Sequence, residues 1–249
     1  MISIKSKREI ELMREAGKIV GECHLLLKDF IKPGVTTLEI DQLIENHILS
    51  YPGAYPIFKG YNGFPNASCC SVNEQVVHGI PNNIPLKEGD IVSVDIGVKY
   101  NGYVGDSAWS YPVGKISKEK EMLLEETKNA LFAGLSKIKE GVHLSDISHE
   151  IEKHANKYKL GIVRNFAGHG VGNNLHEEPE ILNYGPAGHG PILKEGMTLA
   201  IEPMFNLGKD GVIVLKDGWT TVTIDKKPSA HFEHTILVLK DGYEILTKQ

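Results

Sequence analysis

Two aspartates in a predicted β-hairpin have the spacing of a metal-binding pair. Asn101-Gly102 is a strong signal for a two-residue turn between the strand-like segments IVSVDIGVKY and YVGDSAWSY. With that turn, residue 97 faces residue 106, so Asp106 shares a face with its diagonal neighbour Asp95. Two carboxylates on one buried face repel each other unless a cation lies between them. The hairpin alone leaves two interpretations open: a metal site, or two aspartates on the solvent-facing side of a sheet.

Further candidate metal ligands occur later in the chain. Glu202 in TLAIEPMF and Glu233 in AHFEHTILVL each lie among apolar residues, and His169 in GHGVG is flanked by glycines that permit a close backbone approach. The four carboxylates of this set would balance the charge of two divalent cations. The residues therefore predict a two-metal hydrolytic site. Oxygen-rich ligation suits Mn²⁺, Fe²⁺ or Co²⁺ at least as well as Zn²⁺.

Other familiar motifs do not fit. Gly168-His169-Gly170 resembles the start of a dinucleotide fingerprint, but no strand–helix context surrounds it. His176-Glu177 does not begin a zinc-protease helix, because Pro179 follows and residue 180 is Glu. Cys69-Cys70 is adjacent and lacks the spacing of a redox or metal pair.

The elements that must position these residues follow a regular order. Ser6 with Glu9, and Thr36 with Glu39, are capping-box patterns that begin two predicted helices, which stop at Lys32-Pro33-Gly34 and before Pro52-Gly53. Residues 54–86 predict short strands and loops. After the hairpin, Ser117 begins a third predicted helix that stops at Glu140-Gly141. A fourth short helix, a loop-rich stretch and one strand, MTLAIEPMF, follow it.

The two halves of the chain repeat each other at an offset of 107 residues. Without a gap, that offset aligns His47 with His154 and Leu86-Lys87-Glu88-Gly89 with Leu193-Lys194-Glu195-Gly196. It also aligns Asp95 with Glu202. Internal repetition of this kind constrains the fold. We expect one domain over residues 1–249, built from related α-α-β halves of roughly 6–112 and 117–240, which share one sheet about a pseudo-twofold axis.

Composition narrows the class of protein. The chain has 249 residues with 27 basic and 32 acidic side chains, a net charge of −5, which provides no basic field for nucleic-acid binding. Three cysteines are too few for a disulfide framework and favour a reducing compartment. We found no signal-peptide or membrane-helix pattern, so the sequence predicts a cytoplasmic protein without membrane partners.

These residues resemble a known family, the type I methionine aminopeptidases of the short bacterial form. The resemblance covers essentially the whole chain. It is carried by VNEQVVHGIP (72–81), VSVDIGVKYNGYVGDSA (92–108), GHGVGNNLHEEP (168–179), GMTLAIEPMF (196–205) and SAHFEHT (229–235). It implies the mixed α/β (α+β) pita-bread fold, with a central, mainly antiparallel sheet and helices on the outside. It also implies removal of the initiator methionine from nascent proteins when the second residue is small.

The resemblance assigns roles to individual residues. Asp95, Asp106, His169, Glu202 and Glu233 would hold two divalent metals, and Glu202 would relay a proton from the attacking water. His78 would contact the scissile amide nitrogen, and His176 would stabilise the developing oxyanion. The methionine pocket would be lined by Tyr61, Phe64, Cys69, His78, Leu175, His176 and Trp219.

The family pattern is not matched everywhere. Phe64 stands where tyrosine is frequent, and Leu175 stands where phenylalanine is frequent. The loss of an aromatic side chain at 175 predicts a wider pocket. The resemblance further implies a monovalent cation near Asn73, Gln75 and Ser229. It is compatible with a monomer that associates transiently with the ribosome.

Three alternatives stay open from sequence. Xaa-Pro aminopeptidases and prolidases share the ligands but usually carry a large N-terminal domain. Type II methionine aminopeptidases usually carry a helical insertion. A non-catalytic module of the same fold would bind peptide without needing metal, although such a module is expected to have lost ligands.

Overall fold

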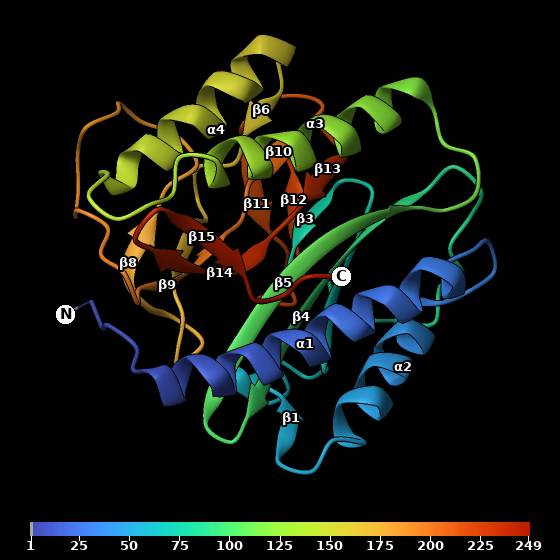
Figure 1. The fold of residues 1–249 in the computed structure, drawn as a ribbon. Coiled ribbons are helices and arrows are strands. Elements are labelled where there is room, and N and C mark those ends of the chain that lie inside the picture. Colours follow the sequence, from blue (N-terminus) through green and yellow to red (C-terminus); the bar gives the residue numbers. More distant parts are fainter. Residues whose placement is uncertain (1) are drawn as a thin grey trace.

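The strands form antiparallel ladders beside two pairs of helices (Figure 1). The computed structural model describes residues 2–249. The first half contains α1 (Lys7–Phe30), α2 (Thr37–Leu49), β1 (Ala54–Pro56), the 3₁₀ turn η1 (Tyr61–Gly63), β2 (Ser68–Val72), β3 (Gln75–Val77), β4 (Ile91–Tyr100) and β5 (Tyr103–Pro112). The second half contains α3 (Lys118–Leu135), α4 (Leu144–Tyr158), β6 (Gly161–Ile162), β7 (Gly168–Gly170), β8 (Glu177–Ile181), β9 (Thr198–Ile201), β10 (Met204–Asn206), β11 (Val212–Val214), β12 (Thr221–Thr223), β13 (Ser229–His231), β14 (His234–Leu239) and β15 (Gly242–Ile245).

Every strand pair among the described residues is antiparallel. The ladders are ordered β1-β4-β2 with β5 beside β4, β15-β14-β9-β7-β8, β13-β10-β6, and β11-β12-β3. The expected mixed fold is confirmed, with its shared sheet divided into these four ladders. The two halves join through the β12–β3 pairing. They also join where the Glu233 amide donates to the Ala108 carbonyl at 2.8 Å and the Ser107 hydroxyl donates to the Glu233 carbonyl at 2.6 Å.

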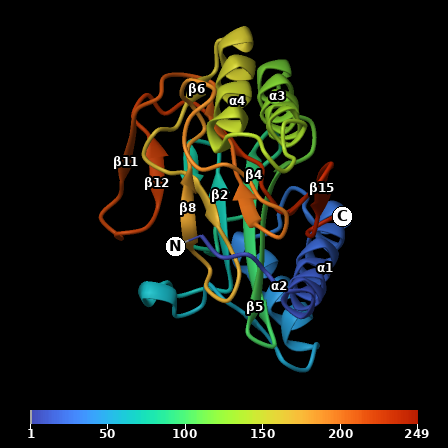
Figure 2. The same cartoon turned by 60° about the vertical axis from the view of Figure 1, so that its left-hand side comes forward.

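The helices cover one side of the strands, as Figure 2 shows from a second direction. The apolar stripe of α1 and α2 packs on β4 through buried residues such as Ile19, Leu27, Ile44 and Val94. The stripe of α3 and α4 packs in the same way on strands of the second half, with Leu131, Ile151, Leu199 and Ile236 in one core. Within residues 2–249, no helix combines the length and the apolar composition that a membrane crossing requires. The opposite side of the strands is left to form the site.

Both expected capping boxes are present. The Glu9 carboxylate accepts from the Ser6 amide at 2.7 Å, and the Glu39 carboxylate accepts from the Thr36 amide at 2.7 Å. Each box satisfies amide groups that the first helical turn leaves without partners. The first two helices therefore begin where the sequence predicts.

The third helix ends earlier than expected. It stops at Leu135, and the Lys137 and Ile138 amides bond to the carbonyls of Gly134 and Leu135, three residues back. The chain continues here as tight turns, which keep Ile138 buried without helical geometry. The expected stop at Glu140-Gly141 is therefore wrong.

The expected single strand MTLAIEPMF is interrupted. β9 ends at Ile201 and β10 begins at Met204, so Glu202-Pro203 lies between two different ladders. Proline has no N–H to contribute to a ladder, which favours a break at this point. The break releases Glu202 from strand pairing.

Main-chain contacts recur at the offset seen in the sequence. The Gly34 amide donates to the Leu86 carbonyl at 2.8 Å, and the Gly141 amide donates to the Leu193 carbonyl at 2.9 Å. Isolated bridges join Thr36 to Pro85 and His143 to Ile192, again 107 residues apart. These paired contacts support the two related halves, 6–112 and 117–240, that we propose within one domain.

The C-terminal segment lies against α1. At Gly17 and Gly21 of that helix, a β-carbon would collide with the backbone at Leu246 and Lys248. Thr247 anchors the C-terminal segment to β14, because its hydroxyl lies 2.9 Å from Nδ1 of His234. The two glycines thus let the end of the chain pack directly on the helix backbone.

Candidate metal centre

The predicted hairpin positions the first two acids. β4 pairs with β5 so that Gly97 faces Asp106 and Asp95 faces Ala108, around the turn Asn101-Gly102. Asp106 is 4% exposed, and Oδ1 of each aspartate is buried without a hydrogen-bond partner among the described residues. Asp95 and Asp106 are therefore brought together, as the turn and the period-two alternation predict.

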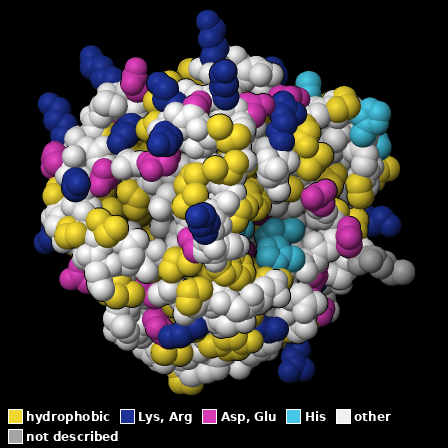
Figure 3. Space-filling view, turned by 180° about the vertical axis from the view of Figure 1, so that it is seen from behind, with side chains coloured by type: hydrophobic (Ala, Val, Ile, Leu, Met, Phe, Trp, Pro, Cys, Tyr) yellow, Lys and Arg dark blue, Asp and Glu magenta, His cyan; other side chains and the backbone are white. Residues whose placement is uncertain are grey.

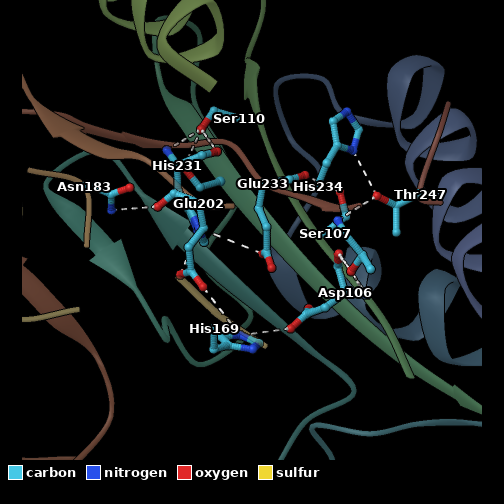
Figure 4. Close-up of polar contacts among 12 residues, drawn as sticks. Asp106, Ser107, Ser110, His169, Asn183, Glu202, His231, Glu233, His234 and Thr247 are labelled. Atoms are coloured by element: carbon cyan, nitrogen blue, oxygen red, sulfur yellow. Dashed lines mark hydrogen bonds and ion pairs between the residues drawn. The ribbon is translucent and has the colours of Figure 1, made fainter. Parts of the chain in front are cut away.

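The second half contributes Glu202 from the β9–β10 break, Glu233 from the β13–β14 junction and His169 from β7 (Figure 4). Nε2 of His169 lies 3.4 Å from Glu202 Oε1 and 3.8 Å from Asp106 Oδ2. One donor atom from each of Asp106, His169 and Glu233 lies within 4.8 Å of the other two. The structure thus gathers acids from both halves around one imidazole.

The orientation of the His169 ring is set by the main chain of the next residue. Its Nδ1 lies 2.8 Å from the Gly170 carbonyl oxygen, so Nδ1–H donates there and Nε2 presents its lone pair to the acids. A hydrogen bond at the second ring nitrogen is the usual support of a metal-binding histidine. Burial lowers the His169 pKa to about 4, which keeps the ring neutral and able to act as a ligand.

Placing these buried acids together makes their ionised forms unfavourable. Burial raises the pKa of Asp95 to about 7. Burial, with repulsion from Asp95 and Glu202, raises the pKa of Asp106 well above its usual range. Burial and the neighbouring acids do the same to Glu202 and Glu233. A cluster that resists ionisation in this way is stabilised by cations.

A cavity of about 260 Å³ is lined by acids that lie around His169 and by apolar side chains that pack in one cluster, including Phe64, Leu175 and Trp219. We refer to these two groups of lining residues as the acidic end and the apolar end of the cavity. It is lined by every residue of the predicted metal and methionine sites: Asp95, Asp106, His169, Glu202, Glu233, Tyr61, Phe64, Cys69, His78, Leu175, His176 and Trp219. Figure 3 shows histidine side chains in a hollow on the face away from the helices, with hydrophobic side chains around it. Twelve residues scattered from 61 to 233 therefore share one cavity.

Two further histidines face this cavity. His176 lies beside His169, with ring centres 4.4 Å apart, and its Nδ1 is 2.9 Å from the Tyr61 hydroxyl. His78 has a φ of 58° and packs edge-on against Phe166. Burial lowers the pKa of His78 to about 4 and also lowers that of His176, so both are neutral imidazoles near pH 7.

The residues predicted for a monovalent cation lie outside the cavity. The Ser229 amide donates to the Asn73 carbonyl at 2.9 Å, which brings the Asn73 and Ser229 segments together. Gln75 accepts from the Val72 amide through its side chain. The Lys120 ammonium donates to Asn73 Oδ1 at 2.9 Å and supplies a positive charge beside this loop.

Sequence reasoning missed six lining residues: Phe58, Asn62, Val77, Phe166, Ala167 and His231. Phe58 enters because Gly97 leaves room for it; a β-carbon at 97 would lie 2.6 Å from the Phe58 ring. No sequence signal identifies that contact. His231 had a signal, since it lies two residues before Glu233 and strand alternation places such residues on one face.

Comparison with known proteins shows the family. Residues 11–240 match the sequence model of metallopeptidase family M24. The chain belongs to metallopeptidase family M24. It is 54% identical over 248 residues to methionine aminopeptidase 1 of Bacillus subtilis, covering 100% of both chains. It is 49% identical over 247 residues to the methionine aminopeptidase of Clostridium perfringens, covering 99% of both.

Solved structures agree. The methionine aminopeptidase of Thermotoga maritima superimposes with a TM-score of 0.98 at 45% identity, covering 100% of both chains. The resemblance found in the sequence is therefore confirmed over the full chain. Membership of M24 also confirms the hydrolase class and the use of divalent metal by this family.

Proposed function

We propose that this M24 chain is a methionine aminopeptidase that removes the initiator methionine from nascent polypeptides when the second residue is small. The observation that supports this most directly is the shared cavity, in which the acids and His169 occupy one end and apolar side chains the other. A substrate with its amino-terminal side chain in the apolar end would present its first peptide bond to the acidic end. The names of the relatives agree with this assignment.

The acidic end fits a metal site. Asp95 Oδ1, Asp106 Oδ1 and Glu233 Oε1 are buried oxygens without hydrogen-bond partners among residues 2–249, and such atoms are costly unless something binds them. We propose two divalent ions, held by Asp95, Asp106, His169, Glu202 and Glu233. The donor set is rich in oxygen, which suits Mn²⁺, Fe²⁺ or Co²⁺ as well as Zn²⁺. When bound, the ions would supply a nucleophilic water at neutral pH and stabilise negative charge.

The remaining groups divide the work of amide hydrolysis. Glu202 lines the cavity beside His169 and would accept the proton of the attacking water. His176, neutral and held by Tyr61, would donate to the oxygen of the scissile carbonyl as charge develops there. His78 would contact the scissile nitrogen and assist its departure.

The apolar end would select methionine. Tyr61, Phe64 and Trp219 present aromatic surface to the cavity, and Phe64 and Trp219 pack edge to face with ring centres 5.1 Å apart. Cys69 and Leu175 complete the lining. An unbranched thioether makes favourable contacts with aromatic edges. Small second residues would be required because the bond must sit close to His78 and His176.

The proposal also covers the setting of the reaction. A nascent chain is attached to the ribosome, so we propose a cytoplasmic monomer that associates with ribosomes transiently. We retain the monovalent-cation site at Asn73, Gln75 and Ser229 as part of the proposal. Thermal unfolding with and without K⁺ tests that site, and co-sedimentation with translating ribosomes tests the association.

The deciding experiment measures release of free methionine from Met-Ala-Ser. Chelated protein would receive Mn²⁺, Co²⁺, Fe²⁺ or Zn²⁺ separately, with an Ala-Pro peptide in parallel. Metal-dependent release from Met-Ala-Ser alone is expected. Cleavage of the Ala-Pro peptide instead would assign the chain to the Xaa-Pro enzymes. No cleavage with any metal, from protein that still binds the peptide, would favour a binding module.

A further inference from the structure

His231 lies within the acidic end of the cavity and has no part in the ligand set described above. It is 2% exposed, and its Nε2 is buried without a hydrogen-bond partner among the described residues. That nitrogen lies 3.7 Å from Glu202 Oε2 and 4.0 Å from Glu233 Oε2. An unpaired buried nitrogen directed at two carboxylates requires a physical reason.

The Glu202 carboxylate lies between two imidazoles (Figure 4). Its Oε1 is 3.4 Å from Nε2 of His169, on the side of the other acids, and its Oε2 is 3.7 Å from Nε2 of His231. The Glu202 main chain is fixed separately, because Asn183 donates to its carbonyl at 3.1 Å. Among residues 2–249, no side chain or amide makes a hydrogen bond to the Glu202 carboxylate. The Nε2 of His169 carries no proton, because Nδ1–H donates to Gly170, so of the two rings only His231 can donate to this carboxylate.

The backbone of His231 is anchored by contacts with two strands. Its amide donates to the Ser110 hydroxyl at 3.0 Å, and that hydroxyl lies 2.9 Å from the His231 carbonyl. It also pairs with Met204 across the β10–β13 ladder. Because Ser110 belongs to β5, the position of His231 is set by both halves of the fold. A ring carried by this anchored backbone can support the neighbouring Glu202 carboxylate.

We propose that His231 is a positioning residue, whose Nε2–H donates to Oε2 of Glu202 and so leaves Oε1 facing the reaction centre. This inference rests on the proposed function, in which Glu202 binds metal and accepts a proton. The present distance is longer than a hydrogen bond, and such contacts often tighten when a catalytic complex forms. Loss of a residue that orients a metal ligand typically lowers metal affinity or activity by about 10–100-fold.

The test separates donation of a hydrogen bond from the mere presence of a ring. His231→Gln keeps an N–H donor of similar reach, whereas His231→Leu removes it at similar volume. His234→Gln is the matched control, since His234 is also buried beside Glu233 but bonds to Thr247 away from the cavity. Each protein would be titrated with Co²⁺ and followed by its visible absorption, and kcat and KM would be measured on Met-Ala-Ser.

In His231→Leu we expect kcat to fall by about 10–100-fold with KM nearly unchanged, together with an altered Co²⁺ spectrum or weaker Co²⁺ binding. His231→Gln should restore both, and His234→Gln should leave the Co²⁺ spectrum as in the wild type. If His231→Leu fails to fold, His231→Asn, whose shorter amide cannot reach Glu202, should show the same losses.

Two outcomes would overturn the proposal. Wild-type kcat and spectrum in His231→Leu would show that Glu202 needs no support from this ring. Equal losses in the Leu and Gln variants would show that the imidazole itself is required, as it would be for a direct metal ligand. If the wild type released no methionine, the proposed function would fail, while the Co²⁺ spectra would still decide the role of His231.

Discussion

The Tyr61 hydroxyl lies 2.9 Å from Nδ1 of His176, and this contact joins the η1 turn of the first half to the segment before β8 in the second. A neutral histidine that accepts a hydrogen bond at Nδ1 carries its proton on Nε2. The role proposed for His176 requires this tautomer, with the Tyr61 hydroxyl as the donor to Nδ1 and Nε2–H free to donate to a substrate. A residue expected only to line the pocket thus also orients a histidine.

Replacing Tyr61 with Phe should lower kcat more than it raises KM. The aromatic ring remains in the pocket, but His176 loses its hydrogen bond to the hydroxyl and with it a contact that orients the ring. A hydrogen bond contributes about 0.5–1.5 kcal/mol, which corresponds to a loss of roughly 2- to 10-fold in kcat. Steady-state kinetics on Met-Ala-Ser measures it, and a change in KM alone would mean that Tyr61 only shapes the pocket.

Removal of the His176 ring itself should have a larger effect. His176→Ala deletes the donor aimed at the developing oxyanion, and loss of such a donor typically lowers kcat by about 100- to 1000-fold. Metal binding should persist, because the ring of His169 is retained. Single-turnover kinetics would isolate the chemical step, and an unchanged rate there would remove His176 from the reaction.

Loss of a central ligand should abolish hydrolysis while leaving the protein folded. Asp106→Asn and His169→Ala each remove a group that faces the other acids. Glu126→Gln is a suitable control, because Glu126 is also buried but pairs with His154 on the helices. Methionine release and circular dichroism would be measured together. Near-wild-type activity in either ligand variant would refute the metal assignment.

The pocket should respond to an aromatic residue at position 175. Leu175 is 3% exposed and lines the cavity, so Leu175→Phe would reduce the space for the first side chain of the substrate. Differences of one methylene in such pockets change specificity by about 10- to 200-fold. The ratio of kcat/KM for Met-Ala-Ser over Leu-Ala-Ser should therefore rise by roughly 10-fold. A constant ratio would place residue 175 outside the specificity pocket.

The capping box of α1 predicts a pH dependence. Hydrogen bonds from the Ser6 side chain and backbone, and from Tyr103, lower the pKa of Glu9 from 4.5 to about 2. A carboxyl whose pKa is depressed on folding stabilises the folded state above pH 4.5, and this stabilisation is lost as the pH falls toward 2. Glu9→Gln should therefore lower the free energy of unfolding more at neutral pH than at acid pH.

Urea unfolding at pH 7 and pH 3 measures the effect of Glu9→Gln. Glu15→Gln is the control, because Glu15 is exposed on the same helix and lies outside the capping box. The Glu9 effect should shrink at the lower pH. An effect of equal size at both values would show that the charge of Glu9 contributes nothing to the cap.

Local patterns predicted much of the fold and of the candidate site. The two-residue turn at Asn101-Gly102 fixes the register of β4 and β5, and with it the shared face of Asp95 and Asp106. Capping boxes mark where α1 and α2 begin, because those bonds form within four residues of the sequence. These features could be predicted since their partners are neighbours in the chain.

Features that depend on distant partners could not be predicted in the same way. Phe58 reaches the cavity only because Gly97, on another strand, leaves space for it. The end of α3 at Leu135 reflects how the chain packs. The break at Glu202-Pro203 had a local signal in the proline, but the change from one ladder to another depends on strands far away in the sequence. Strand alternation could have placed His231 on the same face as Glu233. Its proposed role, however, depends on Glu202, which lies on a separate segment of the chain.

The contact between α1 and the C-terminal segment has a consequence for how the protein opens. The C-terminal residues pack against α1 at Gly17 and Gly21. The helix therefore cannot leave the sheet without displacing the C-terminal segment. Fraying of helix and tail as independent pieces is therefore disfavoured. The amide protons of α1 around these glycines should exchange with solvent only in openings that also release residues 246–249, so the two ends of the chain share one cooperative unit.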